Sequence, residues 1–240
     1  MNRRDLQKAE TCRDILTAAE LLFYQQGYEQ TSIQQIAEQA GLTKGAVYHH
    51  FDSKEALLQR MADDHYNTLL EAVLPIMADK TKSCFSRIAA IIQTTRNIGL
   101  RKSSFVSEYF QVRQNSNSGT LKERLRDSDK KFYRAVLAPL LAEARGTGEC
   151  DFSASPEIIA LFICELDRCT AEEISGIALK NKTAGAEREI QTVLGTFIYA
   201  LSKMLNLDTS TVERIIGTRE SMRFYKKTLS EERKRRHGRQ

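Results

Sequence analysis

Residues 43–50 of this 240-residue chain combine polar, small and aromatic side chains at a spacing that suits the binding of another molecule. If the segment is a short helix, Leu42 and Val47 turn toward a core. The outer face then carries Thr43, Lys44, Gly45, Ala46, Tyr48 and His49 or His50. Such a face fits the major groove of DNA, because small residues permit close approach and polar ones meet base edges. An ordinary helical hairpin without a ligand is the alternative interpretation.

Two short helices and a tight turn are expected to position this segment. Thr31 and Gln34 have capping-box spacing, which predicts the start of a helix with the apolar stripe Ile33, Ile36, Ala37 and Ala40. Gly41 should end this helix, and Thr43 can cap a second one that ends at His50. Residues 32–51 therefore predict a helix-turn-helix.

The neighbouring segments also read as helices. Residues 14–23 place Ile15, Ala19, Leu22 and Phe23 on one face, with Gly27 just past the helix end. Asp52 or Ser53 can cap a long fourth helix that reaches about Ala78, where Pro75 should kink or stop it. Further helices are expected at about 82–98, 104–114, 120–145, 156–180, 186–206 and 210–228.

The chain is thus predicted to be all-α, without internal repeats or β-like alternation. Residues 1–56 should form a three-helix helix-turn-helix domain, joined through the long fourth helix to a second helical domain at 57–228. Ser155 before Pro156, and Ser210 with Glu213, look like helix starts in that domain. Residues 229–240 should be a basic, disordered tail.

Composition excludes several classes. No stretch approaches the roughly 18 apolar residues of a spanning helix, and residues 1–6 lack the apolar core of a signal peptide. We therefore expect a cytoplasmic protein. The net charge is +5, but residues 1–56 carry six Lys or Arg against eight Asp or Glu, a balance of −2. Residues 219–240 carry nine against three, so the excess base lies at the C-terminal end, where it either adds non-specific DNA affinity or is simply solvated.

The residue types that catalyse reactions or bind metals are not spaced as a catalytic or metal site requires. The five Cys are scattered without a C-x-x-C pair, and the four His form no cluster with them. No nucleophile is spaced from a base as catalysis requires. We expect no catalytic residue, no metal site and no cofactor. A helical enzyme and a protein-interaction module that uses the hairpin without DNA remain alternative hypotheses.

About fifty contiguous residues carry a family resemblance. The segments TAAELLF (17–23) and GYEQTSIQQIAEQAGLTKGAVYHHFDSKEALL (27–58) resemble the N-terminal domain of the tetracycline-repressor (TetR) family of bacterial transcription regulators. The resemblance implies a homodimeric, ligand-responsive repressor that binds a palindromic operator in double-stranded DNA and is released by a small-molecule effector. It says nothing specific about residues 75–240.

The resemblance also implies roles at matching positions. Lys44, Gly45 and Ala46 would meet base edges, and Tyr48 would pack on the DNA backbone or a thymine methyl. The residues implied at phosphates are Thr31 or Ser32, His50 and Lys54. Helix N-termini with unpaired N–H groups agree with such phosphate contacts.

The second domain would supply the dimer and the effector pocket. The helices at about 156–180 and 186–206 are more apolar than one buried face requires, so we expect them to form the homodimer interface; a monomer core is the alternative. The candidate pocket residues are Phe105, Tyr109, Phe110, Arg113, Phe132, Tyr133, Phe162 and Glu165. Each could equally be plain core or surface, and Glu165, Asp167 and Arg168 could simply form intrahelical ion pairs.

Overall fold

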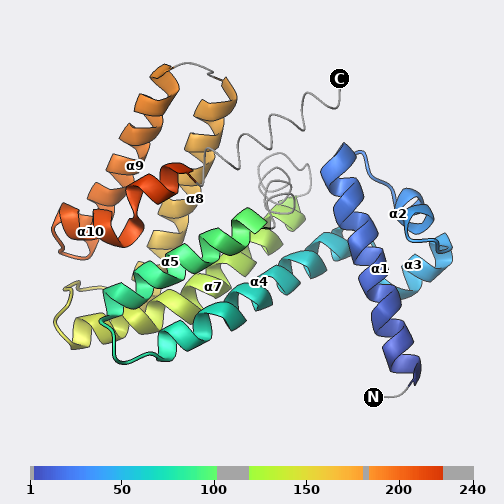
Figure 1. The fold of residues 1–240 in the computed structure, drawn as a ribbon, viewed down its shortest axis with the longest axis horizontal. Coiled ribbons are helices and arrows are strands. Elements are labelled where there is room, and N and C mark those ends of the chain that lie inside the picture. The colour runs from blue at the N-terminus through green and yellow to red at the C-terminus, as the bar shows by residue number, and fades with distance from the viewer. Residues whose placement is uncertain (1–2, 102–118, 181–183, 224–240) are drawn as a thin grey trace. The chain divides into compact units, whose positions relative to one another are not determined.

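The computed structural model describes residues 3–101, 119–180 and 184–223, and no strand occurs in these ranges. The predicted all-α class is confirmed. The helices are α1 (Arg3–Gln26), α2 (Ile33–Gln39), α3 (Lys44–His50), α4 (Lys54–Ala78), α5 (Cys84–Arg101), α7 (Gly119–Gly146), α8 (Pro156–Lys180), α9 (Ala184–Met204) and α10 (Thr209–Ile216) (Figure 1). The expected helix at 104–114 and the expected tail at 229–240 lie outside the described residues.

Side-chain caps fix several of these helix starts as predicted. Thr43 Oγ1 accepts a hydrogen bond from the Ala46 N–H at 3.1 Å, and Ser53 Oγ accepts one from the Ala56 N–H at 3.1 Å. Ser155 Oγ accepts one from the N–H of Ile158. Each cap satisfies an N–H that the first helical turn leaves without a backbone partner.

Two predicted caps were wrong by one or two positions. The capping box of α2 is formed by Ser32 with Gln35, because Thr31 is buried and its hydroxyl donates to the Gly27 carbonyl instead. The N-cap of α10 is Asp208, not Ser210. Both errors arise where several capping residues stand side by side, so that only tertiary packing selects one.

The predicted end of α4 at about Ala78 is confirmed, and Pro75 lies within the last four residues of the helix without stopping it earlier. One expectation about a helix end was wrong. The helix predicted at 210–228 is interrupted at Gly217, whose φ of 65° ends α10. Residues 218–223 are helical again, and the remainder of that prediction lies beyond the described part.

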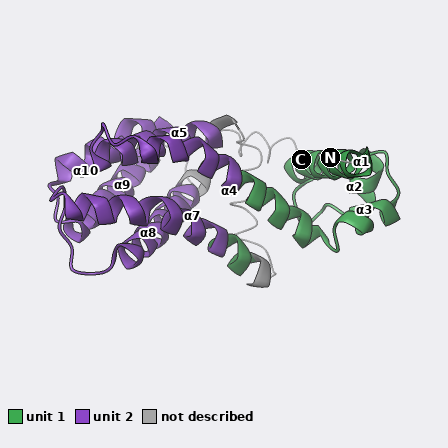
Figure 2. Cartoon of the chain, turned by 90° about the horizontal axis from the view of Figure 1, so that it is seen from below, with its two compact units in different colours: residues 1–65, 102–126, 234–240 green, residues 66–101, 127–233 purple. Residues whose placement is uncertain are grey.

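The chain divides into two compact units, coloured separately in Figure 2. In its described part, unit 1 comprises residues 3–65 and 119–126, and unit 2 comprises 66–101, 127–180 and 184–223. The change from one to the other falls inside α4, between His65 and Tyr66. The predicted domain boundary at residues 56 and 57 stays a prediction.

Helices α8 and α9 contribute to two of the buried clusters of unit 2. Ile159 and Ile163 of α8 share a buried cluster with Phe197, Ile198 and Leu201 of α9. A second cluster toward the other ends of these helices contains Ile174, Ile190 and Leu194. The inward faces of both helices are therefore fully used within one chain.

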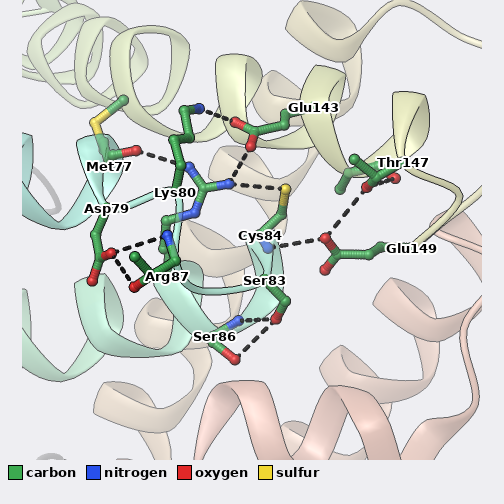
Figure 3. Close-up of polar contacts among 12 residues, drawn as sticks. Met77, Asp79, Lys80, Ser83, Cys84, Ser86, Arg87, Glu143, Thr147 and Glu149 are labelled. Atoms are coloured by element: carbon green, nitrogen blue, oxygen red, sulfur yellow. Dashed lines mark hydrogen bonds and ion pairs between the residues drawn. The ribbon is translucent and has the colours of Figure 1, made fainter.

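A polar network ties α4, α5 and α7 together in the same unit (Figure 3). Arg87 of α5 is 1% exposed. Its guanidinium donates to the Met77 carbonyl at 2.8 Å, to Cys84 Sγ at 3.2 Å and to the Glu143 carboxylate, which also pairs with Lys80. Burial raises the pKa of the Cys84 thiol to about 11, so this sulfur stays a neutral acceptor.

Candidate nucleic-acid interface

The inner face of the helix-turn-helix is anchored in the core of unit 1. Val47 of α3 is 0% exposed and lies in one cluster with Ile36 and Ala37 of α2. The same cluster contains Ile15 of α1 and Leu57 of α4. Ala37 has only a methyl group, which permits the close crossing of α2 and α3. Because Val47 is locked in this core, the opposite face of α3 must point outward.

The turn between α2 and α3 depends on Gly41, whose φ is 68°. The Leu42 N–H donates to the Ala37 carbonyl at 2.9 Å and the Gly41 N–H to the Glu38 carbonyl at 3.1 Å. This is the Schellman pattern, in which a left-handed residue closes the helix end. Leu42 then packs against the core, as expected from the sequence. The turn therefore fixes the angle at which α3 leaves α2.

The outer face of α3 has the composition predicted for it. Lys44, Gly45, Tyr48 and His49 are exposed, and Ala46 is partly exposed. Tyr48 leaves 45% of its area in solvent, which is unusual for a large aromatic residue, and Lys44 Nζ lies 5.8 Å from the centre of its ring. This pair is suited to DNA. The lysine ammonium is attracted to the negative charge of the backbone, and the projecting ring can pack on bases or thymine methyl groups.

His50 lies at the C-terminal end of α3 and is partly buried. Its ring centre is 5.6 Å from that of His49 and 6.5 Å from that of Phe51. Desolvation, followed by the charges of His49 and Lys8, lowers the pKa of His50 below 6.5. In either protonation state a ring N–H can donate a hydrogen bond to a phosphate.

At the start of α2, the structure separates the two hydroxyl residues expected there. Thr31 is 2% exposed, its Oγ1 donates to the Gly27 carbonyl at 2.8 Å, and its N–H donates to the Tyr28 carbonyl. The expectation that Thr31 faces a phosphate was therefore wrong, because the residue is buried. Ser32 is exposed and remains on the outer surface.

Lys54 has an internal role that the sequence did not indicate. Its ammonium donates to the Tyr28 carbonyl at 2.7 Å and to the Glu29 carbonyl at 3.3 Å, and it lies 4.4 Å from the centre of the Tyr28 ring. It thus joins the start of α4 to the segment between α1 and α2. An ammonium has three donors, so these two bonds leave one N–H for a phosphate.

The predicted pocket residues are only partly described, and the described ones do not converge. Phe105, Tyr109, Phe110 and Arg113 lie outside the described residues. Phe132 and Tyr133 pack into the core of unit 2, while Phe162 is 57% exposed on α8. Glu165 pairs with Arg168, as the alternative interpretation held.

Tyr133 brings a hydroxyl group into that core. Its hydroxyl donates to the Asp167 carboxylate at 3.0 Å. Burial, with the charge of Asp167, raises the pKa of Tyr133 well above 10. This hydrogen bond gives the Tyr133 hydroxyl a partner inside the core.

Among the described residues, no group of three His, Cys, Asp or Glu side chains is arranged to hold a metal ion. None of the described helices combines the length and the apolar character that a membrane span requires.

Fold and site together define the class of protein: an all-helical chain whose N-terminal unit presents a helix-turn-helix with an open outer face. Residues 15–61 match the family model described as bacterial regulatory proteins, tetR family.

Transcription regulators match parts of the chain at the level of sequence. The chain is 44% identical over 69 residues to the HTH-type transcriptional regulator TtgR of Pseudomonas putida, covering 28% of this chain and 33% of that protein. It is 27% identical over 139 residues to the HTH-type transcriptional repressor NemR of Escherichia coli, covering 58% and 69%. The match thus spans a third of the length of TtgR.

The similarity of fold extends further along the chain. The transcriptional regulator FadR from Bacillus subtilis, solved in complex with stearoyl-CoA, has a TM-score of 0.60 at 19% identity, covering 77% of this chain and 96% of that one. SmeT, the repressor of the Stenotrophomonas maltophilia multidrug efflux pump SmeDEF, has a TM-score of 0.57 at 20% identity, covering 79% and 89%.

Proposed function

We propose that this protein is a DNA-binding transcription regulator, acting as a repressor that binds a palindromic operator as a homodimer. One observation carries the proposal: the outer face of α3 is held rigidly by Val47 and Gly41, yet its own side chains are left in solvent. A surface that is fixed but uncovered is suited to a partner. The family of residues 15–61 and the naming of TtgR and NemR as transcriptional regulators support the same role.

Each residue of the outer face receives a role in this proposal. Lys44, Gly45 and Ala46 meet base edges, and Gly45 permits close approach because it carries no side chain. Tyr48 packs on the sugar–phosphate backbone or a thymine methyl. The residues assigned to phosphates are Ser32, Thr43, His49, His50 and Lys54. Such contacts set the position of the domain on DNA, whereas the few base contacts select sequence.

The homodimer interface is assigned to α8 and α9. Ile158 and Phe162 stand one turn apart on α8 and are 47% and 57% exposed, and Tyr199 of α9 is 58% exposed. The inward faces of these helices already fill the core of unit 2, so this second apolar face is left for a partner subunit. Two-fold symmetry then doubles the sequence read by one short helix.

Regulation would pass through α4, which contributes residues to both units. We assign unit 2 the binding of a small-molecule effector. Effector binding would shift the population between dimers whose recognition helices fit the operator spacing and dimers whose helices do not.

The first test is in-vitro selection of bound duplexes from a random DNA library at two salt concentrations. We expect an enriched palindrome whose affinity falls as salt rises, because phosphate contacts release counterions. Weak binding without enrichment, repeated in the presence of cell extract to supply an effector, would contradict the proposal. It would favour use of the hairpin for protein–protein contact.

The site assignment is tested with variants on the selected duplex. Tyr48→Ala and Lys44→Ala should each lose operator binding, since a base-reading contact is worth about 1–3 kcal/mol at every half-site. Their circular dichroism and oligomeric state should not change, because both side chains are exposed. The matched control is Lys131→Ala, an exposed lysine on α7. Wild-type affinity in both α3 variants would show that the site is placed wrongly.

A further inference from the structure

The first two turns of α1 extend beyond the core of unit 1. Residues 3–10 are all exposed, and the side chains that pack on the core begin only at Cys12 and Ile15. Figure 1 shows this end of α1 continuing past α2 and α3 within unit 1. Helical structure there is held by the continuation of α1, since none of these eight residues is buried.

The basic residues of this extension are not spread evenly around the helix. Arg4, Lys8, Thr11 and Ile15 follow each other at spacings of four, three and four residues, so they share one stripe of α1. Further along, the same stripe continues through Ala19 and Leu22, which are buried in the core with α2, α3 and α4. Arg4 and Lys8 therefore point to the side of α1 on which α3 lies.

The acidic residues nearby lie elsewhere on the helix. At 3.6 residues per turn, Asp5 falls about 80° from the centre of the Arg4–Lys8 stripe. By the same measure, Asp14 is about 100° and Glu10 about 140° from it. The stripe itself is thus positive, although residues 1–56 as a whole have a balance of −2. The net charge of residues 1–56 conceals this positive stripe, because it sums the charges on all sides of α1 and on the other helices.

The electrostatic environment of His50 agrees with this direction of Lys8. The charge of Lys8 is one of the causes that lower the pKa of His50, after desolvation and the charge of His49. Such an effect agrees with an ammonium on the side of α1 that faces the C-terminal end of α3. Lys8 is therefore on the side of α1 from which it can reach the same DNA as α3.

We propose that Arg4 and Lys8 bind phosphates of the DNA backbone beside the bases contacted by α3, and so extend the interface onto α1. This inference rests on the proposed function. A guanidinium and an ammonium on long side chains suit phosphate oxygens and carry no base preference of their own. The two residues would supply positive charge that the outer face of α3, with Lys44 alone, lacks.

The test compares two double variants on the duplex selected with the wild-type protein. Arg4→Gln with Lys8→Gln removes two charges from the stripe. Arg3→Gln with Arg13→Gln removes two charges from the same helix but from other sides of it, about 120° and 160° away at 3.6 residues per turn. Glutamine keeps a helix propensity close to that of arginine and lysine, so both variants should fold. Affinity is measured at several salt concentrations between 50 and 200 mM, roughly the range over which phosphate contacts act strongly.

The stripe variant should lower affinity at least tenfold and flatten the dependence of log K on log salt. Each phosphate contact contributes about 0.9 to the steepness of log K against log salt. Loss of two contacts should therefore reduce this steepness by about 1.8 for each protomer, or about 3.6 for a dimer. The sequence that it selects from a random library should not change. The control variant should stay within twofold of wild type with nearly the same slope.

Equal slopes in the two double variants would overturn the inference while leaving the proposed function intact, provided that Tyr48→Ala still abolishes operator binding. A wild-type protein that selects no sequence would overturn both. A stripe variant that selects a different sequence would also contradict the assignment, because it would place these side chains at bases.

Discussion

At the scale of single residues, two glycines close together in the helix-turn-helix have opposite requirements. Gly41 has a φ of 68°, whereas Gly45 stands within α3. A Cβ at Gly41 would meet no atom within 4 Å, and a Cβ at Gly45 would meet Thr43 Oγ1 at 3.9 Å, an ordinary contact. Neither position is crowded, so the backbone conformation alone decides the effect of a methyl group on stability.

Gly41→Ala should therefore destabilise unit 1 by about 1–2 kcal/mol, the cost of a left-handed conformation with a Cβ. Gly41→Asn should recover part of this loss, because Asn tolerates that conformation better. Native-state hydrogen exchange of the core amides of unit 1 measures the effect without interference from unit 2. Equal protection in Gly41→Ala and wild type would show that the turn does not depend on this φ.

Gly45→Ala serves as the contrasting variant. It should stabilise the same amides by about 0.5–1 kcal/mol, because alanine loses less backbone entropy in a helix. It should nevertheless weaken operator binding, since the added methyl projects from the exposed face that approaches DNA. Stability and affinity would then move in opposite directions, which a purely structural role of Gly45 would not produce.

Sequence reasoning placed most residues of α3 correctly, because helical periodicity decides which side chains are inward. Val47 and Leu42 were assigned to the core by that rule, and Gly41 by its place after an apolar stripe. The same reasoning failed for Thr31, because Thr31 and Ser32 are both good caps and only the buried Gly27 carbonyl selects one of them. It also missed the contacts of Lys54 to Tyr28 and Glu29, which join residues 26 and 25 positions apart.

At the scale of elements, the network around Arg87 joins three helices and makes their association depend on pH. Hydrogen bonds from Arg87 and Lys80 lower the pKa of Glu143 from 4.5 to about 2. Since the folded pKa lies below the unfolded value, the ionised carboxylate stabilises the native state above pH 4.5. This contribution is lost as the pH falls from there toward 2.

The variant Glu143→Gln isolates this effect. It should be less stable than wild type at pH 7, because buried Arg87 loses its charged partner. The difference in unfolding midpoint should shrink as the pH falls from about 5 toward 2, where wild-type Glu143 becomes protonated. Urea unfolding followed by circular dichroism at several pH values measures both midpoints.

Glu213→Gln is the matched control for that series. Glu213 is exposed on α10 and its carboxylate takes no part in the network. Its substitution should leave the midpoint almost unchanged at every pH. A difference between Glu143→Gln and wild type that stays constant with pH would show that the carboxylate acts by packing and not by charge.

Element positions were easier to predict than the contacts between elements. Apolar periodicity and local caps placed α8 and α9 within a few residues, because both signals are local in the sequence. The Arg87–Glu143 pair was not predicted, because the two residues are 56 positions apart and neither has a distinctive neighbourhood. The interruption at Gly217 was also missed, because one glycine within a periodic segment is compatible with a continuous helix.

At the scale of the whole molecule, the proposed dimer makes a prediction about assembly. Phe162 is 57% exposed and lies one turn from Ile158, on a helix whose opposite side is already buried. Phe162→Arg would bring a charge into the proposed interface, where desolvation is costly and no partner charge is supplied. We expect this variant to be monomeric in analytical ultracentrifugation, with the circular dichroism of the wild-type protein.

Leu74→Arg is the control for Phe162→Arg, because Leu74 is 50% exposed on α4, outside the proposed interface. It should remain dimeric and bind the operator normally. Phe162→Arg should lose most of its operator affinity even though its recognition helix is intact, since two half-sites bound separately lack the gain in effective concentration that a dimer provides. A half-site duplex should bind both variants equally weakly. If Phe162→Arg sedimented as a dimer, or if the wild-type protein sedimented as a monomer, α8 and α9 would not form the interface, and the exposed apolar face would need another partner.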